Sequence, residues 1–215
     1  MPPFSLIAAL AHDGALGQQG GLPWPVLAAD RQWFRLLTTS KNPYTQALCI
    51  VKHPGILTQN RRESFWPSHR NAIILGRRTY QSLPAPLEWR TEIVLTSQGR
   101  LLPKDTHSFD TFQECLLEAE CFNAPHIWVI GGAAVYAEAL QHPGCQALYI
   151  TQVDTECEAD TFWPESRIEW AMGRMQTWGD TRNRARDWHR THSSAWIEEP
   201  DRPEFRFGIW HPQAD

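Results

Sequence analysis

Long apolar runs, paired cysteines and a strong excess of one charge are all missing from this chain of 215 residues. No apolar run approaches the length that spans a bilayer, so we expect no membrane segment. The formal net charge of -4 gives no general argument for a nucleic-acid or membrane-surface partner. The chain also contains no internal repeat and no low-complexity tract, so a repeat architecture is not expected.

Cysteine is scarce and scattered. There are five residues and no C-x-x-C pair: Cys49, Cys115, Cys121, Cys145 and Cys157. An odd number without metal-ligand spacing favours a reducing cytosol and predicts no structural zinc or other metal. The apolar start lacks a basic segment and runs directly into His12 and Asp13, so it does not match a signal peptide. We therefore expect a cytoplasmic protein.

Length and a hydrophobic content of 42% predict one α/β domain over residues 1–215. Strand-like runs alternate with helical patterns, which favours a mostly parallel central sheet with flanking helices. The expected strands are 5–11, 72–75, 92–96, 127–130 and 147–154, followed by a terminal pair near 174–178 and 204–210. In the last strand Phe205, Phe207 and Ile209 alternate as in a half-buried strand, so we expect an antiparallel C-terminal edge.

Asp30 is a carboxylate in apolar surroundings. Residues 26–37 form an amphipathic pattern in which Asp30, Phe34 and Leu37 stand at i, i+4 and i+7. A carboxylate on this core-facing stripe must be paired, neutralised, or available to a ligand that carries hydrogen-bond donors. The alternative is a charge that only complements the helix dipole.

Two helix starts are suited to phosphate. Gly76 ends a buried strand and precedes Arg77, Arg78 and Thr79, where free N–H groups and two guanidinium groups would favour an anion. A solvated helix start is the alternative, although cations are disfavoured at the positive end of a helix. The pair Gly131-Gly132 also lies between a strand and a helix, where either a phosphate or tight packing would explain it.

Four segments occur together and in order: the first strand with its glycine-rich loop, Leu22-Pro23-Trp24 with Asp30, the turn at Gly76, and the turn at Gly131-Gly132. From Ser5 to about Pro164 the chain resembles the dihydrofolate reductase family, with the eukaryotic type of spacing between Trp24 and Asp30. The resemblance implies NADPH-dependent reduction of 7,8-dihydrofolate to tetrahydrofolate, by hydride transfer to C6 and protonation at N5. It further implies a role in one-carbon metabolism and thymidylate synthesis, binding of antifolates, and a monomer without a nucleic-acid partner.

The resemblance also implies which residues act. The catalytic set would be Leu22, Trp24, Asp30 and Thr151. Dihydrofolate would contact Ile7, Ala8, Ala9, Asp30, Arg31, Phe34, Leu83, Leu87, Arg90, Ile130, Tyr136 and Thr151. NADPH would contact Ala9, Leu16, Gly17, Gly21, Trp24, Gly76, Arg77, Arg78, Thr79, Leu95, Thr96, Ser97, Ile130, Gly131, Gly132, Ala133, Ala134, Val135 and Tyr136.

In the family, the residue at Asp30 accepts hydrogen bonds from the pterin ring, with Thr151 bridging through water, and the loop from Gly14 to Trp24 closes over that ring. Arg77 and Arg78 would bind the cofactor phosphates, and a cis peptide would join Gly131 to Gly132. Arg90 matches the arginine that grips the α-carboxylate of the substrate's glutamate tail; a surface arginine is the alternative.

The chain departs from the family pattern near the expected tail site. The segment from Leu83 to Leu87 is shortened, Trp89 replaces a common glycine, and Arg31 replaces an apolar wall residue. Arg31 could cover the benzoyl ring with its stem or point to water. Ala134 replaces an arginine of some relatives, so more of the NADPH preference would rest on Arg77 and Arg78.

Two stretches carry no family motif. The insertion 41–70 has a net charge of +4 and contains Pro43, Pro54, Gly55 and Pro67, so we expect a surface loop that is dispensable for chemistry. A short packed element at 47–51, or a partner or RNA contact, are the alternatives. The variable region 166–203 contains tryptophans that we expect to serve core and loop packing: Trp170, Trp178, Trp188 and Trp196.

Two rival functions come from different classes. One is another NADPH reductase of this fold, such as the pyrimidine reductase of riboflavin synthesis, and the other is a binding protein that has lost catalysis. Neither would be expected to retain the arrangement of Trp24 and Asp30.

Overall fold

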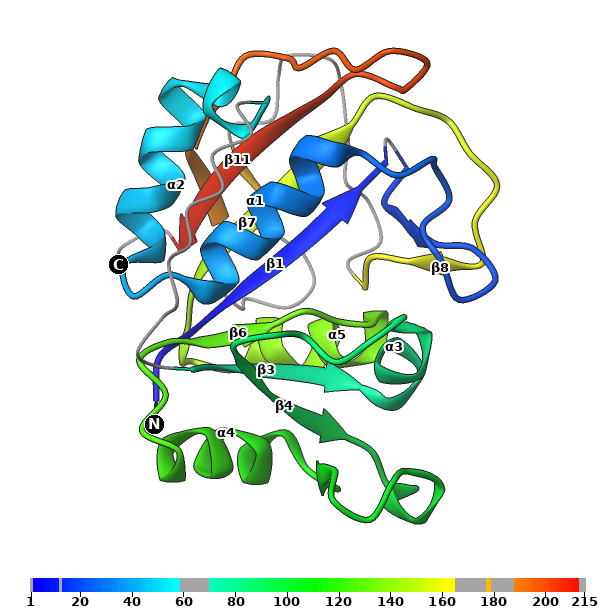
Figure 1. Ribbon diagram of the computed structural model, residues 1–215, viewed down its shortest axis with the longest axis vertical. Coiled ribbons are helices and arrows are strands. Elements are labelled where there is room, and N and C mark those ends of the chain that lie inside the picture. Colours follow the sequence, from blue (N-terminus) through cyan, green and yellow to red (C-terminus); the bar gives the residue numbers. More distant parts are fainter. Residues whose placement is uncertain (1, 12, 59–69, 165–176, 179–187, 213–215) are drawn as a thin grey trace.

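The computed structural model describes residues 2–11, 13–58, 70–164, 177–178 and 188–212 (Figure 1). The helices are α1 (Ala28–Thr39), α2 (Pro43–Lys52), α3 (Arg77–Ser82), α4 (Phe112–Cys121) and α5 (Ala133–Gln141), with short 3-10 turns at η1 (Pro54–Thr58) and η2 (Gly99–Leu101). The strands are β1 (Phe4–Leu10), β2 (Ala15–Gly17), β3 (Asn71–Gly76), β4 (Arg90–Leu95), β5 (His107–Phe109), β6 (Ile127–Val129), β7 (Cys145–Val153), β8 (Thr161–Phe162), β9 (Thr177–Trp178), β10 (Trp188–Ser193) and β11 (Phe205–Pro212).

Nine of the described strands form one sheet in the order β5-β4-β3-β6-β1-β7-β11-β10-β9. From β5 to β7 the neighbouring strands are parallel. From β7 to β9 they are antiparallel. The mostly parallel α/β sheet with an antiparallel C-terminal edge is therefore confirmed. The expected terminal pairing is wrong in one respect, because the unpredicted strand β10 lies between β9 and β11.

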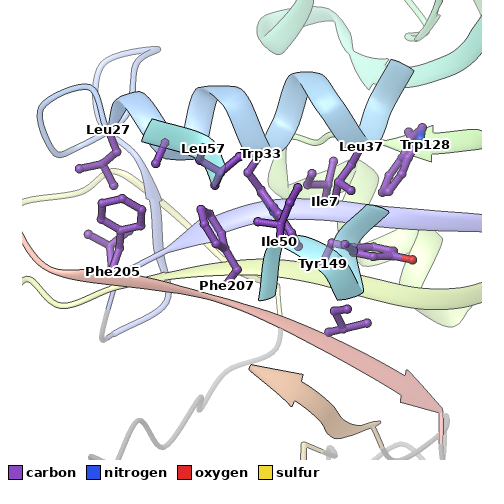
Figure 2. Packing of buried hydrophobic residues seen from close by; sticks show 14 of the residues in the cluster. Ile7, Leu27, Trp33, Leu37, Ile50, Leu57, Trp128, Tyr149, Phe205 and Phe207 are labelled. Carbon is purple, nitrogen blue, oxygen red and sulfur yellow. The ribbon is translucent and has the colours of Figure 1, made fainter. Parts of the chain in front are cut away.

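Helices cover both faces of this sheet. Residues of α4 and α5 pack in one apolar cluster with Leu6 and Leu10 of β1, and residues of α1 and α2 pack in a second cluster with Ile7. Successive side chains of a strand point to opposite faces, so β1 contributes to both clusters. In Figure 2, Trp33 points from α1 toward Phe207 of β11, and the two rings stack with centroids 4.5 Å apart.

The buried stripe of α1 contains the predicted Leu37, but Ala29 and Trp33 take the places that were predicted for Asp30 and Phe34. Ala29, Trp33 and Leu37 are buried against the sheet, whereas Asp30 and Phe34 are only partly buried. Successive helical residues are about 100° apart, so Asp30 and Phe34 lie at the border of the buried stripe rather than within it. Asp30 as a whole residue is therefore partly exposed and does not lie inside the core.

The expectation of a surface loop over the insertion is wrong for residues 43–58. Helix α2 buries Ala47, Ile50 and Val51 in the second cluster, and Leu57 of η1 joins them. Pro43 stands at the first turn of α2, where proline favours a helix start instead of breaking it. Residues 59–69, which include Arg61, Arg62 and Glu63 of the insertion, lie outside the described residues.

Strand β11 is buried on both faces, so the expected half-buried pattern is also wrong. Phe205, Phe207 and Ile209 pack in the second cluster, while Trp210 packs in the first. The antiparallel partners β7 and β10 flank β11, which makes it an interior strand. Trp188 is a core residue and Trp196 is exposed, whereas Trp170 lies outside the described residues. None of the helices that the structure describes is long and apolar enough to cross a membrane.

Candidate active site

The expected site residues gather where parallel strands end. In Figure 1 the arrowheads of β1, β3 and β4 point to the same side of the molecule, and α3 begins directly after β3. The carboxyl ends of parallel strands share one edge of a sheet, which is where ligands of α/β proteins bind. Gly76 is the last residue of β3, Thr96 follows β4, and Ile130 with its two glycines follows β6.

Asp30 is held by a neighbouring strand. The hydroxyl of Thr151 on β7 donates a hydrogen bond to Oδ1 of Asp30 at 2.5 Å, and Thr151 pairs in register with Ala9 of β1. Burial raises the pKa of Asp30 to about 6; the Thr151 hydrogen bond opposes this rise and the charge of Glu199 adds to it. In the part of the chain that the structure describes, no basic side chain forms an ion pair with Asp30. The carboxylate can therefore receive donors from a ligand.

The start of α1 is fixed from the far end of the chain. Glu199 accepts hydrogen bonds from the backbone N–H groups of Ala28 and Ala29 at 2.9 and 2.8 Å. Beside it, Nε of Arg202 donates to the carbonyl oxygen of Val26 at 3.1 Å. Glu199 and Arg202 could not be predicted from the sequence, because a contact across 171 residues leaves no local pattern.

Several of the expected wall residues are small or apolar and only partly buried. Ala8 and Ala9 are only partly buried although both neighbours in β1, Ile7 and Leu10, are buried. The expected wall residues that pack against the second cluster while remaining partly exposed are Ala9, Phe34, Leu83, Leu87 and Ile130. Such surfaces, apolar yet accessible, suit a flat aromatic ligand.

Trp24 and Leu22 have different environments. Trp24 is 6% exposed, and its buried Nε1 has no hydrogen-bond partner among the described residues. A buried donor without a partner is costly, so this N–H suits a water or ligand. Leu22 is 50% exposed.

Tyr136 connects α5 to β1. Its buried hydroxyl donates to the carbonyl oxygen of Ile7 at 2.7 Å. Burial raises the pKa of Tyr136 well above its ordinary value, so the hydroxyl remains a donor at physiological pH. A Cβ atom on Gly131 would lie 2.8 Å from the Tyr136 ring, and Gly131 has a φ of +105°. Both observations require glycine at position 131.

Arg90 is a buried cation at the first residue of β4. Its Nη1 donates to the hydroxyl of Thr38 at 2.9 Å, its Nε donates to the carbonyl of Glu88 at 3.0 Å, and its guanidinium lies 5.7 Å from the ring centroid of Phe34. Burial lowers the pKa of Arg90 to about 10, which leaves it charged at neutral pH. The preceding Trp89 has a φ of +64°, the left-handed conformation that suits the glycine of relatives. Thr38, which orients Arg90, was missed by the sequence analysis.

The two glycine turns lie against each other. The N–H of Gly76 donates to the carbonyl oxygen of Gly131 at 2.7 Å, and a cis peptide joins Gly131 to Gly132. A Cβ atom on Gly76 would meet Cγ2 of Val135 at 3.1 Å, so the close approach depends on glycine. Neither α3 nor α5 has a side-chain cap at its start. Together these starts present free N–H groups to an anion.

Arg77 and Arg78 flank these helix starts. Nη1 of Arg77 donates to Oε1 of Gln81 at 2.9 Å, which holds it along α3, and Arg78 is exposed. The positive charges and the uncapped N–H groups fit the phosphates of a dinucleotide. The donor set therefore fits NADPH.

The glycine-rich loop is attached to the segment around β8. The N–H of Gln19 donates to Oδ2 of Asp160 at 2.7 Å, and the N–H of Asp160 donates to the carbonyl of Gly17 at 3.0 Å. The Gln19 hydrogen bond lowers the pKa of Asp160 below its ordinary value. Asp160 was also missed, since no sequence pattern relates it to the loop.

The remaining expected contacts differ in exposure. Arg31, Gly21, Ser97 and Ala134 are exposed. Leu16, Gly17, Thr79, Leu95, Thr96, Gly132 and Ala133 are partly buried, and Val135 is buried. The individual ligand contacts of these residues stay predictions.

Comparisons with known proteins agree with this geometry. A family profile described as dihydrofolate reductase matches residues 67–192. The dihydrofolate reductase of Bos taurus is 30% identical over 175 residues, covering 78% of this chain and 81% of that protein. The enzyme of Aedes albopictus is 32% identical over 174 residues, covering 77% and 81%.

A solved structure has the same fold. Dihydrofolate reductase from Enterococcus faecalis, complexed with NADP(H) and RAB-propyl, superposes with a TM-score of 0.66 at 23% identity, covering 99% of this chain and 97% of that one. The profile spans more than half of the chain, and the curated relatives extend over most of it. The chain therefore belongs to the dihydrofolate reductase family, a family of NADPH-dependent oxidoreductases.

Proposed function

We propose that Asp30 and the residues around it carry out the reaction of the family in this chain: 7,8-dihydrofolate, NADPH and a proton give 5,6,7,8-tetrahydrofolate and NADP⁺. The observation that carries the proposal is the partly buried Asp30 carboxylate bound by Thr151, beside the accessible alanines of β1. A pterin ring offers the N–H donors that this carboxylate can accept. The product would supply one-carbon metabolism and thymidylate synthesis.

Asp30 would act through its charge. With a pKa of about 6, the carboxylate is mostly ionised at neutral pH. Its oxygens would accept hydrogen bonds from the 2-amino group and N3 of the pterin, and its negative charge would raise the proton affinity of the ring. Solvent would deliver the proton to N5. Thr151 would keep the carboxylate in this orientation.

NADPH supplies the hydride that is transferred to C6. The chain's contribution on this side is binding and orientation. Arg77, Arg78 and the starts of α3 and α5 would hold the phosphates, with Thr96 and Ser97 nearby after β4. The glycines at 76, 131 and 132 would allow close approach of the backbone, and Tyr136 would keep the turn after β6 fixed to β1.

Arg90 would bind the α-carboxylate of the substrate's glutamate tail. Its buried guanidinium is already oriented by Thr38, so little side-chain entropy remains to be lost on binding. Phe34, Leu83 and Leu87 would line the path between the pterin and this cation. Arg31 is exposed and would reach the tail only from the solvent side.

The proposal also covers the cellular compartment and the oligomeric state of the protein. None of the five cysteines, all of which the structure describes, forms a disulfide bond, which favours a reducing compartment such as the cytosol. We expect a monomer that binds dihydrofolate and antifolates but not nucleic acid. Sedimentation with and without added RNA would measure the mass and any complex.

The direct test is to follow the nicotinamide absorbance of purified protein mixed with NADPH and dihydrofolate. We expect turnover with dihydrofolate and none with the pyrimidine substrate of riboflavin synthesis. Turnover of the pyrimidine alone would assign the chain to the rival reductase. Binding of both ligands without absorbance change would identify a non-catalytic protein.

A further inference from the structure

Helix α1 starts without a cap of its own. Leu27 occupies the N-cap position and provides no side-chain hydrogen bond. The first N–H groups of a helix lack internal partners, and serine, threonine, aspartate or asparagine usually satisfies them. Here both oxygens of the Glu199 carboxylate do so, each accepting one N–H, from Ala28 and from Ala29. Asp30 is the next residue in the chain.

Glu199 is itself held firmly. Ile197 and Phe205 exchange backbone hydrogen bonds at 2.7 and 3.1 Å, and the N–H of Arg202 donates to the carbonyl of Glu199 at 3.2 Å. The turn is therefore closed and continuous with β11. In that strand Phe207 pairs with Thr151, the residue that binds Asp30. The start of α1 and the Asp30 side chain are thus fixed against the same pair of strands.

We propose that Glu199 is a positioning residue for the reaction: its two-oxygen cap on α1 places the Asp30 carboxylate against Thr151 and toward the pterin. This inference rests on the proposed function of Asp30. Negative charge at the start of a helix is favourable, so the cap is stable where it stands. Its second effect is electrostatic, because the charge of Glu199 acts on the neighbouring carboxylate.

The electrostatic effect provides a readout that a purely structural cap would not give. Around Asp30, the groups that act on its ionisation are Thr151 on β7 and Glu199 on the closed turn, and burial adds to the effect of Glu199. Arg31, the next residue of α1, is exposed. Removing the Glu199 charge should therefore lower the pKa of Asp30 from about 6 toward its ordinary value.

The experiment compares Glu199→Gln and Glu199→Ala with the control Glu198→Gln. The control removes the same charge from the exposed neighbouring residue. Glutamine retains one acceptor oxygen and half of the cap, whereas alanine retains none. We expect kcat/KM for dihydrofolate to fall about threefold in Glu199→Gln and about tenfold in Glu199→Ala, with KM for NADPH within about twofold of wild type. Glu198→Gln should match the wild type.

The second measurement is the pKa of the Asp30 carboxyl, followed by ¹³C NMR of aspartate-labelled protein without substrate. We expect a lower pKa in both Glu199 variants and no change in Glu198→Gln. Unchanged kcat/KM and pKa in the Glu199 variants would overturn the proposal. Equal losses for dihydrofolate and NADPH, with an unchanged pKa, would reduce Glu199 to a general stabilising contact and also overturn it.

The experiment also gives an answer if one variant does not fold or if the wild type is inactive. If Glu199→Ala does not fold, the kcat/KM and the Asp30 pKa of Glu199→Gln test the proposal, because glutamine can keep one hydrogen bond to the helix. If the wild type does not reduce dihydrofolate, the proposed function fails, while the NMR titration still reports whether Glu199 controls Asp30.

Discussion

Helix α1 and the pair α3 and α5 begin in opposite ways. The first N–H groups of α1 are bound by the Glu199 carboxylate of the same chain. The starts of α3 and α5 have no side-chain cap, and α3 begins with two arginines. Of these three helix starts, the chain therefore satisfies that of α1 internally and leaves those of α3 and α5 available for an external anion.

We propose that the difference reflects the two roles proposed for these helix starts. A residue that directs proton affinity needs a fixed position, and an internal carboxylate provides it without a ligand. A phosphate-binding start needs free donors, and an internal cap there would compete with the phosphate. We therefore expect changes near α1 to alter the chemical step or stability, and changes at α3 to alter cofactor affinity.

The largest effect should come from Asp30→Asn. The change keeps the size and one acceptor for Thr151 but removes the charge that α1 positions. We expect turnover at neutral pH to fall roughly 10² to 10³-fold, about 3 to 4 kcal/mol of transition-state stabilisation. The loss should shrink as pH falls, because solution then protonates the substrate. Steady-state rates from pH 5 to 9 measure this, with exposed Asp105→Asn as the control; near-normal turnover at pH 7 would contradict the role of Asp30.

Helix α2 packs against α1, so the substitution Ile50→Ala should weaken the packing that holds α1 in place. Ile50 is fully buried in the cluster that includes Trp33 and Leu37. We expect the free energy of unfolding to fall by about 3 kcal/mol, since the lost methyl groups leave a cavity. Urea unfolding measures it, and the exposed neighbour in Cys49→Ala should change stability by less than about 0.5 kcal/mol. Equal stability of both variants would show that α2 is not part of the core.

The cost of burying the ionised Asp30 carboxylate should lower the free energy of unfolding of the substrate-free protein. Its folded pKa, about 6, exceeds the ordinary value of 3.8, so the folded protein binds this proton more tightly than the unfolded chain. The stability from this group is complete below the unfolded pKa and is lost as pH rises through about 6. Asp30→Asn should thus be more stable than wild type by roughly 2 to 3 kcal/mol at pH 7 and nearly equal to it at pH 4. Thermal unfolding at both pH values would reveal a constant difference if the carboxylate were not desolvated.

The smallest effect should come from Arg77→Ala, at the uncapped side. Removing one charge-assisted contact to the 2′-phosphate should raise KM for NADPH roughly tenfold and leave KM for NADH nearly unchanged. Lys52→Ala on α2 is an exposed control of the same charge. If NADPH and NADH weaken equally, Arg77 does not bind the phosphate.

The sequence predicts those parts of the site that local chemistry determines. Asp30, Arg77 and the Gly131-Gly132 turn each stand in a short pattern of strand, glycine and helix, and the structure places them at one edge of the sheet. Glu199 and Asp160 could not be predicted, because their partners are distant in sequence and a lone acid carries no signal of its own.

Over helix α2 we expected a surface loop, with a short packed element at 47–51 only as the alternative. The prolines and Gly55 indicated a loop, yet Pro43 begins the helix and Ala47, Ile50 and Val51 follow at helical spacing. Strand β10 was missed because its polar sequence, Trp188 to Ser193, shows little apolar alternation. Backbone pairing with β11 forms this strand, and that pairing leaves no pattern in the side chains of β10.

The separation of 171 residues between Ala28 and Glu199 has a consequence for synthesis on the ribosome. The parallel strands β1, β3, β4, β6 and β7 are all made before the turn that carries Glu199 and before the interior strand β11. A growing chain can therefore pair these parallel strands first, while α1 still lacks the partner for its first N–H groups. The placement of Asp30 that we propose for Glu199 can therefore form only after residue 199 has been made.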